Sequence, residues 1–320
     1  MSKHLKVIGT ILITVLFFAL LACQPAKKGK IVVGFSQIGA ESAWRVANTE
    51  SIQKEAAKRP DIELKFSDAQ QRQENQIKAL RNFIAQKVDV IGFSPVVESG
   101  WEPVLKEAKA AKIPVILTDR AVDTNDDSLW VTFMGSDFVE EGRKAARWLI
   151  EYLQGKPANI AELQGTVGSA PAIDRKLGFE EVIKDHPELK IIKSQTGEFT
   201  RSKGKEVMEA FLKAEGKNIN VLFAHNDDMA LGAIQAIEEY GLKPGKDITI
   251  VSIDAVRGAF EAMIEGKLNC TVECSPLLGP QFFDAVEDLM AGKTLPRRIV
   301  TKESVFPQEV AAETLPNRTY

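Results

Sequence analysis

Cysteine and histidine are scarce in this chain of 320 residues, which has three of each. His186 and His225 stand alone, without the spacing of zinc ligands, and His4 lies in an N-terminal segment that we expect to be removed. A strand covers about 13 Å between Cys270 and Cys274, whereas the Cα atoms of a disulfide lie within about 7 Å. We therefore expect no metal site and no disulfide, and we interpret both cysteines as packing residues.

Motifs for catalysis and for nucleotide phosphates are also missing. The chain has neither GxxxxGK[ST] nor GxGxxG. The segment 123–127 resembles the start of a calcium loop, but Ser128 replaces its glycine and Met134 replaces its bidentate glutamate. Asp119 and Asp254 could form the carboxylate pair of a glycosidase, but the arginine after Asp119 argues against it. We expect neither an enzyme nor a bound cofactor.

A strong positive charge is absent, because the formal net charge is −3. This balance argues against nucleic acid as the main partner. The composition, 44% hydrophobic and 27% charged, is ordinary for a globular protein. The length suits two domains of about 100–150 residues each.

One long apolar run is present, and it lies at the N-terminus. Lys3 and Lys6 precede Val7–Ala22, which is almost entirely apolar and is followed by Cys23. This order is typical of an export signal, and Leu-Leu-Ala-Cys resembles the lipobox of bacterial lipoproteins. We expect residues 1–22 to be a signal peptide and Cys23 to carry a lipid that anchors the protein outside the cytoplasm. A plain signal and an uncleaved helix are the alternatives.

Strands and helices alternate in two similar series along the rest of the chain. Strands are expected to start at residues 31, 62, 88 and 113, and again at 159, 190, 220 and 247. Such spacing indicates βαβ units and parallel sheets. The fold class is therefore α/β, with two Rossmann-like lobes joined by a hinge that the chain crosses several times. We expect residues 31–135 and 274–298 in the N-terminal lobe, and 136–273 and 299–320 in the C-terminal lobe.

The stretch Ile113–Arg120 directs attention to a cleft between these lobes. Its apolar run ends abruptly on Asp119 and Arg120. Ligands of open parallel sheets bind outside the carboxyl ends of the strands. Taken alone, the two charges fit an ion pair that caps a strand as well as they fit a ligand contact. Their place among several polar strand ends that face a second lobe favours the ligand contact.

Further polar and aromatic residues follow the other strand ends. The first half provides Gln37, Glu41, Trp44, Arg45 and Ser94, and the second half and tail provide Arg175, Phe199, Asn226, Asp254 and Glu273. Carboxylate and amide oxygens accept hydrogen bonds from hydroxyl groups, guanidinium groups donate to them, and flat rings cover C–H faces. This set predicts a carbohydrate site, although Glu41 and Arg45 could instead form a solvated loop.

Several stretches resemble one protein family over about residues 31–290. They are KIVVGFSQIGAESAWR, DRAVD, AIDRKLGF, GEFTRSKG, FAHNDDMALGA and SIDAV. Together they resemble the periplasmic sugar-binding proteins of ABC transporters, of the ribose and galactose type, and most closely their galactofuranose-binding subgroup. The resemblance implies the type I periplasmic binding protein fold.

The resemblance also implies which residues hold the sugar. Six positions match family contacts from both lobes: Asp119, Arg120, Arg175, Phe199, Asn226 and Asp254. Three positions depart from the ribose-type pattern, since Trp44-Arg45 replaces two aromatics, Ser94 replaces an asparagine, and Glu273 stands near a family glutamine. These departures favour galactofuranose or a related aldose.

The expected function is that of a lipid-anchored receptor, which we expect to be a monomer. It would close on a monosaccharide by hinge motion and pass the sugar to an ABC permease. The alternative is a sensor that presents its closed form to a membrane histidine kinase or chemoreceptor. A transcriptional regulator is excluded, because an export signal stands where a DNA-binding headpiece would be.

Overall fold

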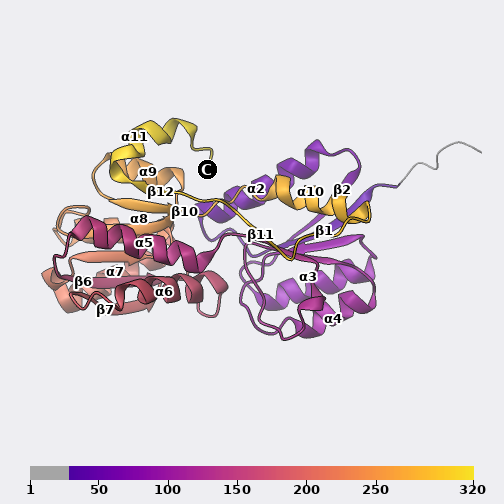
Figure 1. Ribbon diagram of the computed structural model, residues 1–320, viewed down its shortest axis with the longest axis horizontal. Coiled ribbons are helices and arrows are strands. Elements are labelled where there is room, and N and C mark those ends of the chain that lie inside the picture. Colours follow the sequence, from indigo (N-terminus) through magenta and orange to yellow (C-terminus); the bar gives the residue numbers. More distant parts are fainter. Residues whose placement is uncertain (1–28) are drawn as a thin grey trace, which may run out of the picture.

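The computed structural model describes residues 29–320, so the predicted signal peptide and Cys23 lie outside the described residues. Two lobes lie side by side, each built around one six-stranded sheet (Figure 1). The α/β class with two parallel-dominated sheets is confirmed. Within the described part of the chain, each helix is too short or too polar to cross a membrane.

The first lobe has the strand order β11-β5-β4-β3-β1-β2, and all its strand pairs are parallel. Its strands are β1 (Ile31–Gln37), β2 (Ile62–Asp68), β3 (Val90–Phe93), β4 (Val115–Thr118), β5 (Thr132–Gly135) and β11 (Arg298–Val300). Its helices are α2 (Ala43–Lys58), α3 (Gln73–Ala85), α4 (Glu102–Ala110) and α10 (Gly279–Met290).

The second lobe has the order β12-β10-β9-β8-β6-β7, in which β12 alone is antiparallel to its neighbour. Its strands are β6 (Ala158–Gln164), β7 (Leu189–Thr196), β8 (Val221–Ala224), β9 (Thr249–Asp254), β10 (Cys270–Glu273) and β12 (Val305–Pro307). Its helices are α5 (Phe138–Leu153), α6 (Ala170–Ile183), α7 (Arg201–Glu215), α8 (Asp227–Glu239), α9 (Arg257–Ile264) and α11 (Ala311–Thr314).

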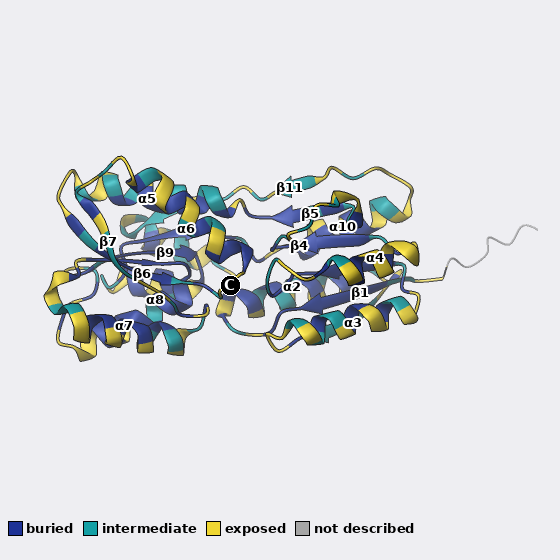
Figure 2. Cartoon of the chain, turned by 90° about the horizontal axis from the view of Figure 1, so that it is seen from below, coloured by how far each residue is buried: buried dark blue, intermediate teal, exposed yellow. Residues whose placement is uncertain are grey.

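Helices cover both faces of the first sheet, because its central strands β3 and β4 are apolar and buried along their whole length. Alternate residues of a strand point to opposite faces. Phe35 packs with α2 and α10, whereas Phe93 and Leu117 pack with α3 and α4. Figure 2 shows the buried strands running through both lobes between half-exposed helices. The continuous apolar runs thus produce a rigid base on which the strand-end loops are held.

The chain crosses between the lobes three times: after β5, after β10 and after β11. Here the structure corrects one predicted boundary. Residues 299–320 were expected in the C-terminal lobe, but β11 pairs with β5 of the first lobe through Val300. The polar run from Thr301 to Ser304 makes the crossing, and β12 starts at Val305 in the other sheet. The last crossing therefore follows Val300.

Candidate ligand-binding site

The carboxyl ends of the two sets of strands face each other across a cavity between the lobes. Its lining comes from both lobes: Glu41, Ser42, Trp44, Arg45, Asp119, Arg120, Pro171, Arg175, Phe199, Asn226, Asp254 and Cys274. The space between these residues is about 290 Å³. The cavity therefore suits a small ligand.

Arg45 organises the wall contributed by the first lobe. Ser42 caps α2 by accepting a hydrogen bond from the backbone N–H of Arg45, which fixes the start of this helix. The Arg45 guanidinium donates to Asp119 Oδ2 at 2.6 Å, to Glu41 Oε1 at 3.1 Å and to Gln37 Oε1 at 3.3 Å. All these side chains are buried, so the wall is rigid before a ligand arrives. The alternative of a solvated loop for Glu41 and Arg45 is wrong.

Asp119 pairs mainly with Arg45 and not with its neighbour Arg120. Its Oδ2 accepts from Arg45 at 2.6 Å and from Ser94 Oγ at 3.0 Å, whereas Arg120 Nε lies 3.8 Å away. The backbone of Asp119 is left-handed, with φ of 62°, and its N–H donates to Met134 O. This turn at the end of β4 points the carboxylate into the cavity. The alternative of a strand-capping Asp119–Arg120 pair therefore does not describe the main contact.

Arg120 presents free donors to the cavity. Its Nη1 donates to Val96 O at 2.9 Å, and its guanidinium lies 5.3 Å from the ring centre of Phe199 in the opposite lobe. Burial lowers the pKa of Arg120 to about 10, with further lowering by Arg45, so the group stays protonated at neutral pH. Its Nε is buried and has no hydrogen-bond partner among the described residues. A ligand with acceptor oxygens would satisfy the remaining donors.

Arg175 organises the wall contributed by the second lobe. From α6, it donates through Nε to Glu141 Oε2 at 2.7 Å and through Nη1 to His225 O at 2.5 Å. Its Nη2 lies 3.6 Å from Asp254 Oδ1. Burial raises the pKa of Asp254, while Arg175 opposes that shift. The cavity thus has a second guanidinium and carboxyl pair opposite the first.

Asn226 and Phe199 support each other in the same wall. Asn226 caps α8 by accepting from the backbone N–H of Met229, and its Nδ2 donates to Phe199 O at 3.2 Å. Phe199 has a left-handed backbone with φ of 62°. Such a conformation is uncommon for an aromatic residue and is kept only where its surroundings hold it. The asparagine therefore fixes the ring that covers the cavity, besides lining it.

The structure brings nine of the twelve predicted ligand residues to the cavity lining. They are Glu41, Trp44, Arg45, Asp119, Arg120, Arg175, Phe199, Asn226 and Asp254. Gln37 and Ser94 lie behind this wall, where Gln37 supports Arg45 and Ser94 supports Asp119.

Glu273 does not line the cavity, and this expectation is corrected. Its carboxylate binds Arg318 at 2.7 Å and Tyr320 at 3.3 Å near the C-terminus. Successive side chains of β10 point to opposite faces, so the next residue, Cys274, takes the cavity position instead. Cys274 was interpreted as a packing residue, and it is buried. It also lines the cavity, and its carbonyl accepts a hydrogen bond from Trp44 Nε1 at 2.6 Å.

Sequence reasoning missed Ser42, Pro171 and Glu141. Ser42 precedes a helix and Pro171 stands at the start of one, so each has an ordinary structural explanation in the sequence. Glu141 lies in the first turn of α5, more than thirty residues before Arg175, with no local pattern to connect them. Contacts between distant helices are set by packing, which spacing along one helix does not show.

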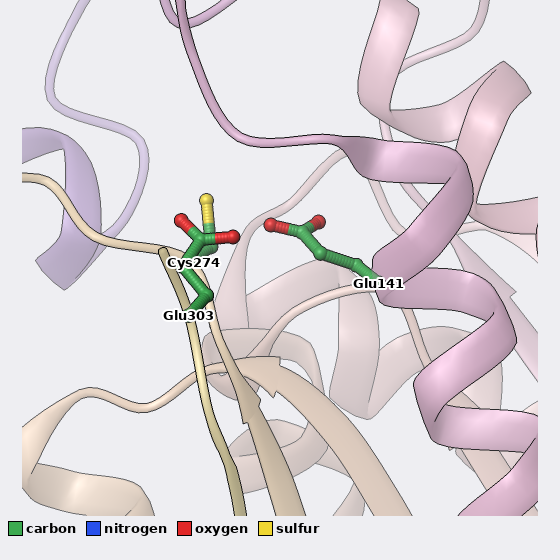
Figure 3. A group of neighbouring side chains, drawn as sticks. All are labelled: Glu141, Cys274 and Glu303. Atoms are coloured by element: carbon green, nitrogen blue, oxygen red, sulfur yellow. The ribbon is translucent and has the colours of Figure 1, made fainter. Parts of the chain in front are cut away.

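Glu141, Cys274 and Glu303 lie together at the hinge (Figure 3). A carboxylate oxygen of each glutamate and the Cys274 Sγ lie within 4.8 Å of one another. The Glu303 carboxylate accepts from the N–H of Ser275 and from Thr301 Oγ1, both at 2.9 Å. It also accepts from the hydroxyl of Ser136. Because these partners lie on the three crossings, the group is a hydrogen-bonded link across the hinge.

The charge state of Glu141 is shaped by this setting. Burial raises its pKa to about 8, Arg175 opposes the shift, and the charge of Glu303 adds to it. One Glu141 oxygen is buried without a hydrogen-bond partner among the described residues. Glu141 therefore connects the hinge link to the guanidinium that faces the cavity.

Direct contacts hold the two lobes closed around the cavity. The backbone N–H of Ala43 donates to Asp228 Oδ2 at 2.7 Å, so the N-terminus of α2 meets a carboxylate of the other lobe. On another side, Glu98 N donates to Gly168 O at 2.9 Å. The structure is therefore the closed form of a two-lobe receptor fold.

Comparisons with known proteins agree with this architecture. The family described as periplasmic binding protein domain matches residues 33–294. The galactofuranose-binding protein YtfQ of Escherichia coli is 54% identical over 89% of this chain and 90% of its own length.

Two solved structures are similarly close. The binding component of the arabinose ABC transporter of Shewanella sp. ANA-3, bound to α- and β-L-arabinofuranose, is 56% identical with a TM-score of 0.87, covering 90% of this chain and 95% of its own. A protein of Mycobacterium smegmatis in complex with β-D-fucofuranose is 55% identical with a TM-score of 0.88, covering 91% and 95%.

Proposed function

This chain belongs to the periplasmic binding protein family, and on that premise we propose that it is an extracytoplasmic receptor for a monosaccharide. The sugar would be galactofuranose or a related aldose in its furanose form. Three relatives that cover nearly the whole chain are named for, or hold, a furanose.

The observation that carries this proposal is the balanced charge of a small cavity between the lobes. Three guanidinium groups and three carboxyl groups line it: Arg45, Arg120, Arg175, Glu41, Asp119 and Asp254. An ionic ligand would leave one kind of charge uncompensated. A neutral polyol offers donors and acceptors to both kinds, and Phe199 covers its apolar face.

The role we propose is delivery of the sugar to an ABC permease. A relative that shares 56% of its residues is the binding component of an arabinose ABC transporter. The sensory alternative requires the same binding and differs only in the membrane partner. Stimulation of ATP hydrolysis by the reconstituted transporter upon addition of this protein and sugar would distinguish the two roles.

We further propose that a lipid on Cys23 anchors a monomeric receptor to the membrane. The support is the sequence Leu-Leu-Ala-Cys after a basic and apolar segment. Changing Cys23→Ser should release the protein from washed membranes into the soluble fraction. A variant that remains in the membrane fraction would contradict lipid anchoring.

The binding proposal is tested by calorimetric titration with a panel of pentoses and hexoses. The panel includes D-galactose, L-arabinose and D-ribose, and methyl furanosides and methyl pyranosides separate the two ring forms. We expect binding of a furanose at micromolar affinity or better, about −8 kcal/mol. Absence of binding to every sugar at millimolar concentration would exclude the proposal.

A further inference from the structure

A second cavity opens beside the ligand cavity, at the side of the cleft formed by the loops after β2, β6 and β7. We call it the mouth pocket, and its lining comes from both lobes: Ile38, Glu41, Gln70, Gln71, Arg72, Val96, Arg120, Thr166, Val167, Thr196 and Glu198. It measures about 900 Å³, counted out to its opening. Glu41 and Arg120 line both cavities, so the two spaces adjoin at these side chains.

The floor of the mouth pocket is buried and incompletely satisfied. Ile38 and Val96 are 2% and 5% exposed and provide an apolar base. The Glu41 and Arg120 side chains are 3% and 4% exposed. Glu41 Oε2 and Arg120 Nε have no hydrogen-bond partner among residues 29–320. Unpaired buried polar atoms cost about 1–3 kcal/mol each, so they indicate that a ligand group or a water supplies the missing partner where the two cavities adjoin.

The walls of the mouth pocket present polar groups that the protein leaves unused. Within the described chain, no hydrogen bond or ion pair is made by the side chains of Gln70, Gln71, Arg72, Thr166 or Glu198, and all but Thr166 are exposed to solvent at the pocket opening. Arg72 comes from one lobe and Glu198 from the other, so the walls offer both a cation and a carboxylate. Their charges cancel, which favours a neutral ligand with both donors and acceptors.

The loops that carry these groups are held in place by the backbone. Gln71 N donates to Ile38 O at 2.6 Å, and Glu198 N donates to Thr196 Oγ1 at 3.2 Å. Gln71 and Glu198 have left-handed backbones, with φ of 60° and 55°. Such conformations persist where the surroundings determine them. The walls are therefore ordered around the pocket and do not need to form when a ligand binds.

We propose that the mouth pocket is a second sugar subsite. It would receive a neutral polyhydroxylated unit joined to the sugar in the inner cavity, with Glu41 and Arg120 beside the linkage. The protein would then bind a short furanoside such as a disaccharide as well as a free monosaccharide. This inference rests on the proposed function, since the inner cavity must hold the first sugar.

The test uses calorimetric titration with two probes, D-galactose and the disaccharide β-D-galactofuranosyl-(1→6)-D-galactofuranose. In the disaccharide either ring can enter the inner cavity. The informative variant is the double change Arg72→Ala with Thr166→Val, one residue from each wall. Neither side chain has a protein partner, and Arg72 makes no side-chain cap of α3. The matched control is Lys78→Ala, which removes an exposed cation from the same helix.

We expect the wild-type protein to bind both probes. The double variant should weaken disaccharide binding by about tenfold, because it loses the hydrogen bonds that Arg72 and Thr166 would make to the second sugar. Its affinity for the monosaccharide should stay within about twofold of wild type. Lys78→Ala should change neither. Thermal melting of each variant checks that it is folded.

Two results would overturn the second subsite while leaving the proposed function intact. One is binding of the monosaccharide with no binding of the disaccharide. The other is a double variant that binds the disaccharide as tightly as wild type or weakens both probes equally. If neither probe binds, while the sugar panel also fails, the proposed function and the subsite fall together.

Discussion

Asp119 is the residue on which the first-lobe wall depends, and two substitutions should affect it differently. Asp119→Asn keeps the shape and tolerates the left-handed backbone, but it removes the charge that binds Arg45 at 2.6 Å. We expect sugar affinity to fall about tenfold to a hundredfold with a small change in melting temperature. Asp119→Ala leaves the buried Arg45 without its main partner and should cost about 3–5 kcal/mol of folding stability.

Calorimetric titration and thermal melting of both Asp119 variants measure these effects. The exposed Asp123→Asn, which removes a carboxylate from the same segment, is the control and should change neither property. An Asp119→Asn protein that binds sugar as tightly as wild type would show that the carboxylate is only structural.

Positions of site residues could be predicted from the sequence, but their partners could not. Strand ends are readable from apolar runs, which is why nine of the predicted residues reach the cavity. Asp119 pairs with Arg45 and not with Arg120 because the start of α2 lies beside the end of β4, a contact between distant segments that no local pattern encodes. Likewise, the sequence predicted Glu273 at the end of β10 as a cavity residue, whereas the next residue, Cys274, lines the cavity.

Helices α5 and α6 pack so closely that a glycine controls the position of Arg175. A Cβ on Gly142 would lie 2.2 Å from Arg175 O. Glycine to alanine in a helix ordinarily stabilises by about 1 kcal/mol, but here we expect Gly142→Ala to destabilise by about 1–3 kcal/mol and to weaken sugar binding. Gly34→Ala is the control, because its Cβ would lie 2.5 Å from the Phe83 ring in the middle of β1, away from the residues that line the cavity.

Both glycine variants should melt at a lower temperature, but Gly142→Ala alone should bind the sugar more weakly. Calorimetric titration at a temperature where both variants are folded makes the comparison. Equal affinities in the two variants would show that the position of α6 does not determine how Arg175 meets the ligand.

A buried carboxylate joins four elements of the second lobe and should give it acid sensitivity. Glu162 on β6 contacts His225, just after β8, at 3.1 Å and Lys176 on α6 at 2.9 Å, and it accepts from Ser194 on β7. Burial by itself raises the pKa of Glu162, but His225, Ser194 and Lys176 outweigh it and lower the pKa to about 2.

A carboxyl group with a lowered pKa stabilises the fold above its unfolded pKa of about 4.3. That contribution is lost as the pH falls from about 4.3 to 2. Glu162→Gln should therefore be less stable than wild type at pH 7, with a flatter loss of stability in acid. Urea unfolding at pH 7, 4 and 3 measures this, and the exposed Glu151→Gln is the control. Parallel curves for wild type and Glu162→Gln would contradict the assignment.

Element types were predictable where the apolar pattern is long, and less so where it is interrupted. The two series of alternating strands and helices appear in the expected order. The tail did not follow the pattern, because Ile299 and Val305 belong to different sheets despite being six residues apart. Three-residue strands carry too few side chains to show which sheet they join.

At the scale of the whole molecule, closure should be trappable by a disulfide. A Cβ built on Gly168 lies 3.9 Å from Val97 Cβ in the other lobe, within the range of about 3.5–4.5 Å for disulfides, and the φ of 78° at Gly168 puts backbone strain on a cysteine there. In a Cys23→Ser background, oxidised Val97→Cys/Gly168→Cys should keep a compact radius of gyration with or without sugar and release bound sugar slowly. The native Cys270 and Cys274 are buried and should not interfere.

Small-angle scattering and stopped-flow release measure this effect. The reduced double variant is the control and should regain opening and fast release. If the oxidised protein releases sugar as fast as the reduced one, opening does not separate Val97 from Gly168.

The two-lobe organisation was predictable from the repeated spacing, whereas closure was not. Cross-lobe contacts such as Ala43 to Asp228 join residues that are 185 positions apart, and each is explained locally as a helix start. Ala43 and Asp228 hold the lobes together only because the folded structure places the two helix starts side by side.

The threefold crossing of the chain also determines when each lobe can be completed during synthesis. Strand β11 forms one edge of the first sheet, and α10 packs beside α2 on one face of that sheet. In the chain, however, α10 and β11 come after every strand of the second sheet except β12. A ribosome must therefore translate through Val300 before the first lobe has its full set of strands. Neither lobe is a contiguous segment, so cutting the chain between them yields two incomplete pieces. Both lobes can therefore be completed only late in synthesis, after nearly the whole chain has been translated.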